Sequence, residues 1–134
     1  MPCTYTTRQV EKVTVIDASG WITIGESSED LRKIIHGQVN AGRKLILLNF
    51  REVARVDSAG ISGLMYGLSV VAKSGGALKL CGLRKWVKEI MIGQAKLDSL
   101  VPIFDQESTA LASFGQASFA QVRLGGLTAE LADI

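Results

Sequence analysis

The segment Lys44-Leu45-Ile46-Leu47-Leu48-Asn49-Phe50 is a nearly continuous apolar run in a chain of 134 residues. Such a run is typical of a β-strand that is covered on both faces, as in parallel sheets. After a short loop comes Val56-Asp57-Ser58-Ala59-Gly60-Ile61, and from there apolar residues recur at spacings of three and four. The two segments predict a buried strand followed by a helix from Ser58 to Lys73.

On the N-terminal side of this unit, we expect a hairpin and a further helix. The β-branched runs Val13–Ile16 and Trp21–Ile24 flank Asp17–Gly20, which has the composition of a turn. Ser27-Ser28-Glu29-Asp30 then supplies an N-cap and an acidic first turn for a helix that ends at Ala41-Gly42.

On the C-terminal side, strand-like and helix-like segments continue to alternate. Ala77–Cys81 is expected to be a strand, and Leu100–Phe104 a last short one, where Pro102 favours an edge position. A third helix carries Val87, Ile90 and Met91 on one stripe, and a final helix starts near Glu107.

The resulting order is β-β-α-β-α-β-α-β-α. It predicts an α/β fold with a mixed, mostly parallel sheet of about five strands and four helices packed on it. We expect one domain over residues 5–116, with residues 117–134 as a C-terminal extension or tail. This length is sufficient for a hydrophobic core.

The composition limits the class of protein. Hydrophobic residues make up 47% and charged residues 21%, as in soluble globular proteins. The net charge is only +2 without a dense Lys/Arg cluster, which argues against a nucleic-acid partner. The absence of a signal-peptide pattern and of a long apolar run predicts a cytoplasmic protein with no membrane partner. Cys3 and Cys81 match no metal-site spacing and are expected to be free thiols, so we expect no metal and no cofactor.

The start of the predicted second helix is the candidate site. Asp57 is placed to act as N-cap, accepting hydrogen bonds from the amides of Ala59 or Gly60. Ser58 then lies in the first turn, where its hydroxyl can point to solvent. A helix N-terminus favours a phosphate, although Asp57 would repel it. These residues alone are also consistent with a simple helix cap.

The outer face of the same helix points to docking. Its residues are small near Ser58 and apolar or aromatic further along, whereas exposed helix faces are normally rich in Lys, Glu and Gln. This face is predicted to comprise Ala59, Ser62, Gly63, Tyr66 and Val70. Glycines at positions 60, 63 and 67 each cost up to about 1 kcal/mol in a helix, so close approach of another backbone would explain them.

The apolar strand, the loop and the motif Asp57-Ser58-Ala59-Gly60 together resemble the signature of STAS domains, and more narrowly of bacterial anti-sigma factor antagonists. The likeness covers roughly residues 5–116. It implies a partner switch without enzymatic activity. The unmodified protein would bind a serine-kinase anti-sigma factor and release a sigma factor. The kinase would phosphorylate Ser58, and a serine phosphatase would reverse this.

The resemblance also implies a set of binding residues. The loop after the second strand lines the docking surface in this family, and Gly25 and Glu26 occupy that place, with Glu26 where an Asp is often found. Ala59 stands where many members have a second hydroxyl, which leaves Ser58 as the only candidate within the motif. We expect a monomer or weak dimer. The implied partner-binding residues are Gly25, Glu26, Asp57, Ala59, Gly60, Ser62, Gly63 and Tyr66.

Two alternatives stay open at this point. A STAS domain can also be an accessory subunit of a lipid transport or stressosome-like complex. Trp86 lies in a basic cluster with Arg84, Lys85 and Lys88, which is either a solvated helix face with a half-buried indole or a rim contact with an acidic partner. Catalysis is disfavoured, because the only histidine, His36, lies in the middle of a predicted helix and matches no catalytic motif.

Overall fold

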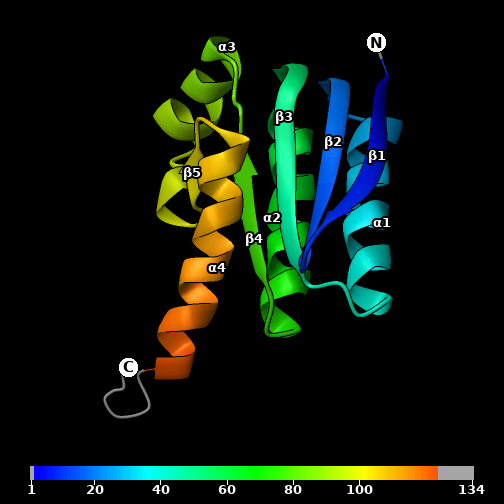
Figure 1. Ribbon diagram of the computed structural model, residues 1–134. Helices are drawn as coiled ribbons and strands as arrows, with labels where there is room; N and C mark the ends of the chain where they lie inside the picture. The colour runs from blue at the N-terminus through cyan, green and yellow to red at the C-terminus, as the bar shows by residue number, and fades with distance from the viewer. Residues whose placement is uncertain (1, 124–134) are drawn as a thin grey trace.

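The computed structural model describes residues 2–123 and is an α/β fold built on one five-stranded sheet (Figure 1). The strand order is β1-β2-β3-β4-β5, with β1 antiparallel to β2 and the other neighbours parallel. The elements are β1 (Cys3–Val10), β2 (Val13–Ile22), α1 (Glu26–Asn40), β3 (Leu45–Val56), α2 (Ser58–Lys73), β4 (Ala77–Cys81), α3 (Lys85–Lys88), a π-helical turn (Glu89–Gln94), a 3₁₀ turn (Leu97–Ser99), β5 (Ile103–Phe104) and α4 (Glu107–Arg123). The predicted fold class is confirmed.

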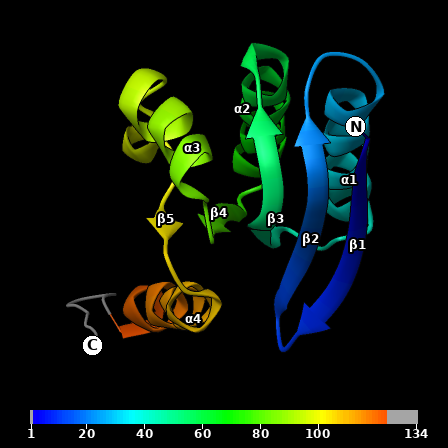
Figure 2. The same cartoon turned by 90° about the horizontal axis from the view of Figure 1, so that it is seen from above.

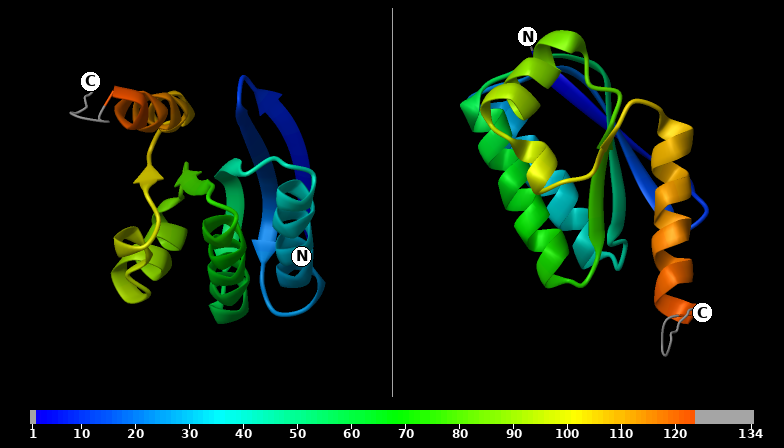
Figure 3. Two further views of the ribbon diagram at one scale, coloured as in Figure 1. Left: turned by 90° about the horizontal axis from the view of Figure 1, so that it is seen from below. Right: turned by 90° about the vertical axis from the view of Figure 1, so that its left-hand side faces the viewer.

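The helices lie in two layers on either side of the sheet. α1, α2 and α3 lie side by side on one face, and α4 lies on the other face (Figures 2 and 3). The larger core fills the space under α1 to α3 and includes Leu48. A smaller core under α4 contains Leu47 and Phe114. Because Leu47 and Leu48 are both fully buried, β3 is covered on both faces, as its apolar run predicts.

The N-terminal hairpin differs from the prediction. It joins Cys3–Val10 to Val13–Ile22, so the turn lies at residues 11–12 and β2 runs straight through Asp17–Gly20. The polar segment stays in the sheet because Asp17 finds charged and amide partners on β1 and β3. Gly20 adopts φ 121°, and the register with β3 shifts on either side of it. A bulged strand therefore replaces the predicted turn.

Helix bounds agree with the sequence at α2 and differ at α1. α2 runs from Ser58 to Lys73 as predicted, whereas α1 begins at Glu26 with Gly25 at the N-cap position, where φ is 109°. The serines therefore are not caps. They lie buried in the first turn, and Ser28 Oγ donates to the Gly25 carbonyl at 3.0 Å.

The C-terminal elements test the predicted last strand and the predicted start of the C-terminal extension. The strand order confirms that β5 is an edge strand, but β5 is shorter than the predicted Leu100–Phe104. Pro102 lies just before it, and the Pro102 carbonyl accepts from the amide of Leu80 at 3.0 Å. α4 continues past residue 116 to Arg123. The boundary between a domain over residues 5–116 and an extension over residues 117–134 stays a prediction, and residues 124–134 lie outside the described part of the chain.

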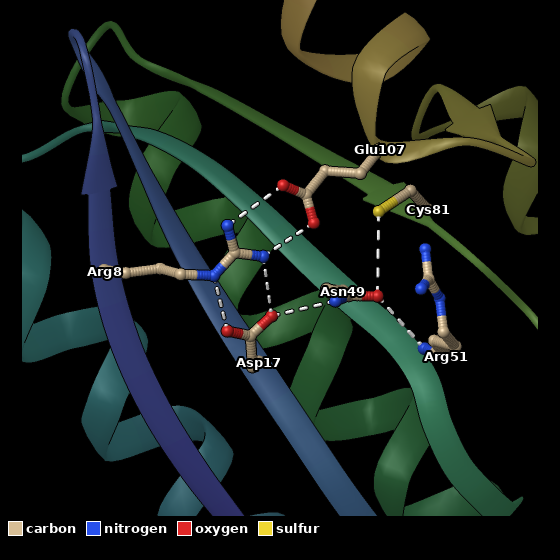
Figure 4. Close-up of polar contacts among 6 residues, drawn as sticks. All are labelled: Arg8, Asp17, Asn49, Arg51, Cys81 and Glu107. Carbon is tan, nitrogen blue, oxygen red and sulfur yellow. Dashed lines mark hydrogen bonds and ion pairs between the residues drawn. The ribbon is translucent and has the colours of Figure 1, made fainter.

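A polar network joins the first three strands to the start of α4 (Figure 4). The Arg8 guanidinium donates to Asp17 at 2.7 Å and to Glu107 at 2.6 Å, and Asn49 donates to Asp17 at 2.8 Å. The Arg8 hydrogen bonds hold the pKa of the Asp17 carboxyl below its usual value. Cys81 Sγ lies 3.9 Å from Asn49 Oδ1, and burial raises the pKa of this free thiol to about 11. The network is thus a structural clamp on α4 rather than a site with a reactive thiol.

Candidate functional site

The Asp57 carboxylate joins the start of α2 to the loop after β2. Its Oδ1 accepts from the amide of Gly60 at 3.0 Å, as predicted for an N-cap, and its Oδ2 accepts from the amide of Ile24 at 2.9 Å. Partial burial acts to raise the pKa of Asp57, but hydrogen bonds from the amides of Ile24, Gly60 and Ala59 outweigh it and lower the pKa. The carboxylate is therefore ionised at neutral pH and fixes both segments.

Ser58 is the first residue of α2 and is exposed. Within residues 2–123 its hydroxyl makes no hydrogen bond, so it is free to react with another molecule. The single histidine of the chain does not activate it. His36 lies on α1, where its Nδ1 is 3.2 Å from the side-chain amide of Asn40.

The loop between β2 and α1 presents an apolar side chain beside this serine. Ile24 is 82% exposed, and Gly25 and Glu26 are exposed next to it. The loop is nonetheless fixed, because Ser27 Oγ accepts from the amide of Thr23 at 2.9 Å and donates to its carbonyl at 3.0 Å. The sequence prediction placed Ile24 in a strand and missed this residue. A single exposed apolar side chain is common on protein surfaces, so Ile24 indicates docking only together with its position next to the Ser58 motif.

Further along α2, Ser62 and Tyr66 are exposed next to Arg32 of α1. Arg32 Nη2 donates to Ser62 Oγ at 3.0 Å, and the guanidinium lies 5.2 Å from the centroid of the Tyr66 ring. Ala59 lies half-buried at the start of the same helix. The outward position predicted for Ser62 and Tyr66 is confirmed.

The glycines of α2 serve packing inside the protein. Gly60, Gly63 and Gly67 are all buried. A Cβ at Gly60 would lie 2.3 Å from the Ile22 carbonyl oxygen, and one at Gly63 would lie 3.1 Å from the Ser28 carbonyl oxygen. The close approach predicted from these glycines is thus made by β2 and α1 of the same chain. The prediction that Gly63 faces outward is wrong, and a contact of Gly60 or Gly63 with a partner stays a prediction.

We call the exposed surface around the serine the Ser58 face. It combines an apolar tip, small residues, two hydroxyls and an aromatic ring, and Asp57 holds its two halves together. Its residues are Ile24, Gly25, Glu26, Ser58, Ala59, Ser62 and Tyr66.

No helix in residues 2–123 combines the length and the apolar character needed to cross a membrane. Nor do three or more His, Cys, Asp or Glu side chains converge as metal ligands anywhere in that part of the chain.

Comparisons with known proteins agree on the fold. The family model described as STAS domain matches residues 4–110. A putative anti-sigma factor antagonist from Thermotoga maritima superposes with a TM-score of 0.75 at 24% identity, over 81% of this chain and 92% of that one. The phosphorylated form of SpoIIAA, a cell fate determinant of Bacillus, superposes with a TM-score of 0.64 at 16% identity, over 83% and 99%.

A third solved structure carries the same fold under a different description. A sulfate transporter family protein from Wolinella succinogenes superposes with a TM-score of 0.67 at 21% identity, over 78% of this chain and 85% of that one. A search of curated proteins finds no match.

Proposed function

Because the chain belongs to the STAS domain family, we propose that it acts as an anti-sigma factor antagonist controlled by phosphorylation of Ser58. In this proposal the unmodified protein binds a serine-kinase anti-sigma factor in the cytoplasm and so releases a sigma factor. The kinase transfers the γ-phosphoryl group of ATP to Ser58 Oγ, and a serine phosphatase removes it by hydrolysis. The protein acts as a monomer or weak dimer, without enzymatic activity of its own, through residues 5–116.

The observation that carries the proposal is the position of Ser58. Its hydroxyl is exposed at the N-terminus of α2 and makes no hydrogen bond to the part of the chain that the structure describes, and it lies on a face with a fixed apolar tip at Ile24. The likeness to a structure of SpoIIAA in its phosphorylated form supports this choice.

Phosphorylation at this position would act on binding and not on folding. A phosphoserine adds a charge of about −1.5 to −2 at neutral pH. The free amides of the first turn partly offset that charge in the free protein. In a complex the partner would remove water from the same charge, next to the ionised Asp57 carboxylate. Burying an unpaired charge in this way costs several kcal/mol of binding free energy, on the order of 3–5 kcal/mol. The modified protein should therefore stay folded and lose its partner.

The experiment incubates the protein with each serine-kinase anti-sigma factor encoded in its own organism, with ATP, and locates phosphate by mass spectrometry. We expect one kinase to bind the unmodified protein and to phosphorylate Ser58. Ser58→Ala should abolish phosphorylation, whereas Ser62→Ala, which removes the exposed hydroxyl one turn further along α2, should not. Phosphate on another residue, or no kinase that binds, would overturn the proposal.

A binding measurement completes the test. Ser58→Asp should weaken kinase binding by about tenfold or more while the free energy of unfolding changes by less than about 1 kcal/mol, as for a surface substitution. If no kinase binds and the protein instead copurifies with a transporter or a stressosome-like complex, the accessory-subunit alternative would replace the switch.

A further inference from the structure

α3 lies near the carboxyl end of β3 (Figures 1 and 2). A second surface feature is lined by residues from this region. It is a shallow groove of about 430 Å³. Its walls include Trp21 at the end of β2, Arg55 and Val56 at the end of β3, and Trp86 and Ile90 from the helical segment that follows β4. The groove is thus lined mainly by apolar and aromatic side chains, with one cation at its edge.

Trp86 is the most unusual residue of this groove. The indole is 68% exposed, so the half-buried position favoured by the sequence is wrong. Tryptophan buries more apolar area than any other side chain when a partner covers it, and it is enriched among the residues that dominate binding energy. The helix is also irregular here, since the Ala95 amide donates to the Ile90 carbonyl at 2.9 Å across five residues. Such π-turns occur frequently at functional sites.

The charges around the groove favour an acidic partner. The Arg55 guanidinium lies 5.0 Å from the centroid of the Trp21 ring and so keeps its charge at the edge of the groove. Arg84 pairs with Glu52 at 3.3 Å. Within residues 2–123, Arg55 and Lys85 have no ion-pair partner, and they outnumber Glu89 of the π-helical turn, the one carboxylate in the helical segment 85–94 after β4 that lacks one.

The groove is built from the same ends of β2 and β3 that lead into the Ser58 face. Val56, in its wall, is followed directly by Asp57 and Ser58, and Trp21 lies three residues before Ile24. A protein that covers Ser58 therefore approaches the strand ends that also line the groove.

We propose that this groove binds an acidic segment of a protein partner, with an apolar or aromatic side chain of that segment packed between Trp86 and Trp21. The carboxylates of the segment face Arg55 and Lys85. The inference rests on the proposed function only for the identity of the partner, the serine-kinase anti-sigma factor. The preference for an acidic segment follows from the residues of the groove.

Both tryptophans of the chain line the groove, so their two indole N–H signals report on it selectively in an NMR titration. The probes are three synthetic peptides with a central Phe flanked by Glu, by Lys or by Ser. We expect the acidic peptide to shift both indole signals and to bind about tenfold more tightly than the basic one. Arg55→Glu should abolish that preference, whereas Arg43→Glu, at an exposed site between α1 and β3, should not. Equal binding of all three peptides, or no shift of the indoles, would overturn the proposal.

The kinase supplies the second arm of the test. Trp86→Ala should weaken kinase binding by about tenfold, as for an anchor residue, without lowering the melting temperature. The matched control is Leu100→Ala, which shortens another exposed apolar side chain outside the groove and should leave binding unchanged. If kinase binding is lost in Ser58→Asp but unaffected in Trp86→Ala, the proposed role of the groove is wrong and the proposed switch at Ser58 still holds. If no kinase binds, the proposed function fails, and the peptide titration alone decides on the groove.

Discussion

The Asp57 carboxylate holds the backbone amide of Ile24 at 2.9 Å across 33 residues of sequence. The same carboxylate caps α2 through the amide of Gly60. Ile24 is 82% exposed, so burial of its own side chain cannot be what fixes it. One ionised side chain therefore links the apolar tip to the start of α2, in addition to the Ser27 hydrogen bonds that fix Thr23, and the two halves of the Ser58 face form a single unit.

Removing the Asp57 carboxylate should loosen this unit. Asp57→Ala loses the N-cap and the bond to Ile24, so we expect the free energy of unfolding to fall by about 1–2 kcal/mol. The amide of Ile24 should also exchange faster with solvent, which NMR hydrogen exchange can measure. Ser58→Ala is the control, because it keeps the carboxylate. Unchanged exchange at Ile24 in Asp57→Ala would show that the loop is fixed without Asp57.

The same carboxylate should make stability depend on acid pH. Its pKa in the folded protein lies below the value of about 3.9 for an unfolded chain, so its contribution is present above about pH 4 and is lost as pH falls through the folded-state pKa. Asp57→Asn keeps a good N-cap but cannot ionise. The difference in unfolding free energy between wild type and Asp57→Asn should therefore be constant near neutrality and shrink below pH 4. If this difference in unfolding free energy instead grew as the pH fell, the pKa of Asp57 would not be lowered in the folded protein.

The fold was largely predictable because its signals are local. The Asp57 cap before Ser58 is found as predicted, and the apolar run lies in a strand as predicted. β3 is longer than predicted, however, because it continues to Val56 through the segment that the sequence predicted to be a short loop. The hairpin was misplaced because Asp17–Gly20 has turn composition, whereas its strand conformation depends on pairing with β1 and β3. That pairing is tertiary and overrides local propensity.

The site was predictable in part. Spacing along a helix identified Ser58, Ser62 and Tyr66 as exposed. The same reasoning placed Gly63 outside, because a helical wheel does not show that Ser28 of α1 approaches there. Ile24 was missed because it ends the β-branched run Trp21–Ile24, which predicts a strand. Only its bond to a residue far along the chain reveals its role.

Two helical glycines should respond in opposite ways to substitution by alanine, because Gly60 is buried and Gly37 is exposed. Gly60→Ala would place a Cβ 2.3 Å from the Ile22 carbonyl oxygen, so β2 and α2 must move apart, and we expect a loss of about 1–3 kcal/mol. Gly37 lies exposed in α1 with no atom within 4 Å of a Cβ built there. Gly37→Ala should therefore stabilise the protein by about 0.5–1 kcal/mol. Urea unfolding compares the two, and equal effects would argue against close packing at Gly60.

The clamp on α4 should respond to loss of Arg8 (Figure 4). Arg8→Met removes both ion pairs, which are partly exposed, so the cost should be about 1 kcal/mol and should shrink at high salt. The pKa of Asp17 should rise toward its usual value, because Arg8 is the main cause of its depression. A ¹³C carboxyl titration measures that shift. Arg43→Met, which removes an exposed arginine elsewhere, should leave the pKa of Asp17 unchanged. An unchanged pKa of Asp17 in Arg8→Met would show that the clamp does not form.

Ile24 should matter for binding and not for stability. Its side chain is 82% exposed, so Ile24→Ser removes little buried area, and we expect the free energy of unfolding to change by less than about 0.5 kcal/mol. A partner that covers the Ser58 face would bury the whole side chain, which is worth about 1.5–3 kcal/mol for an isoleucine. Binding of the kinase should accordingly weaken about tenfold or more, as isothermal titration calorimetry would measure. Leu100→Ser is the control, because it replaces another exposed apolar side chain by serine away from this face. This variant should bind the kinase as the wild type does. Equal affinities for Ile24→Ser and Leu100→Ser would place the interface elsewhere.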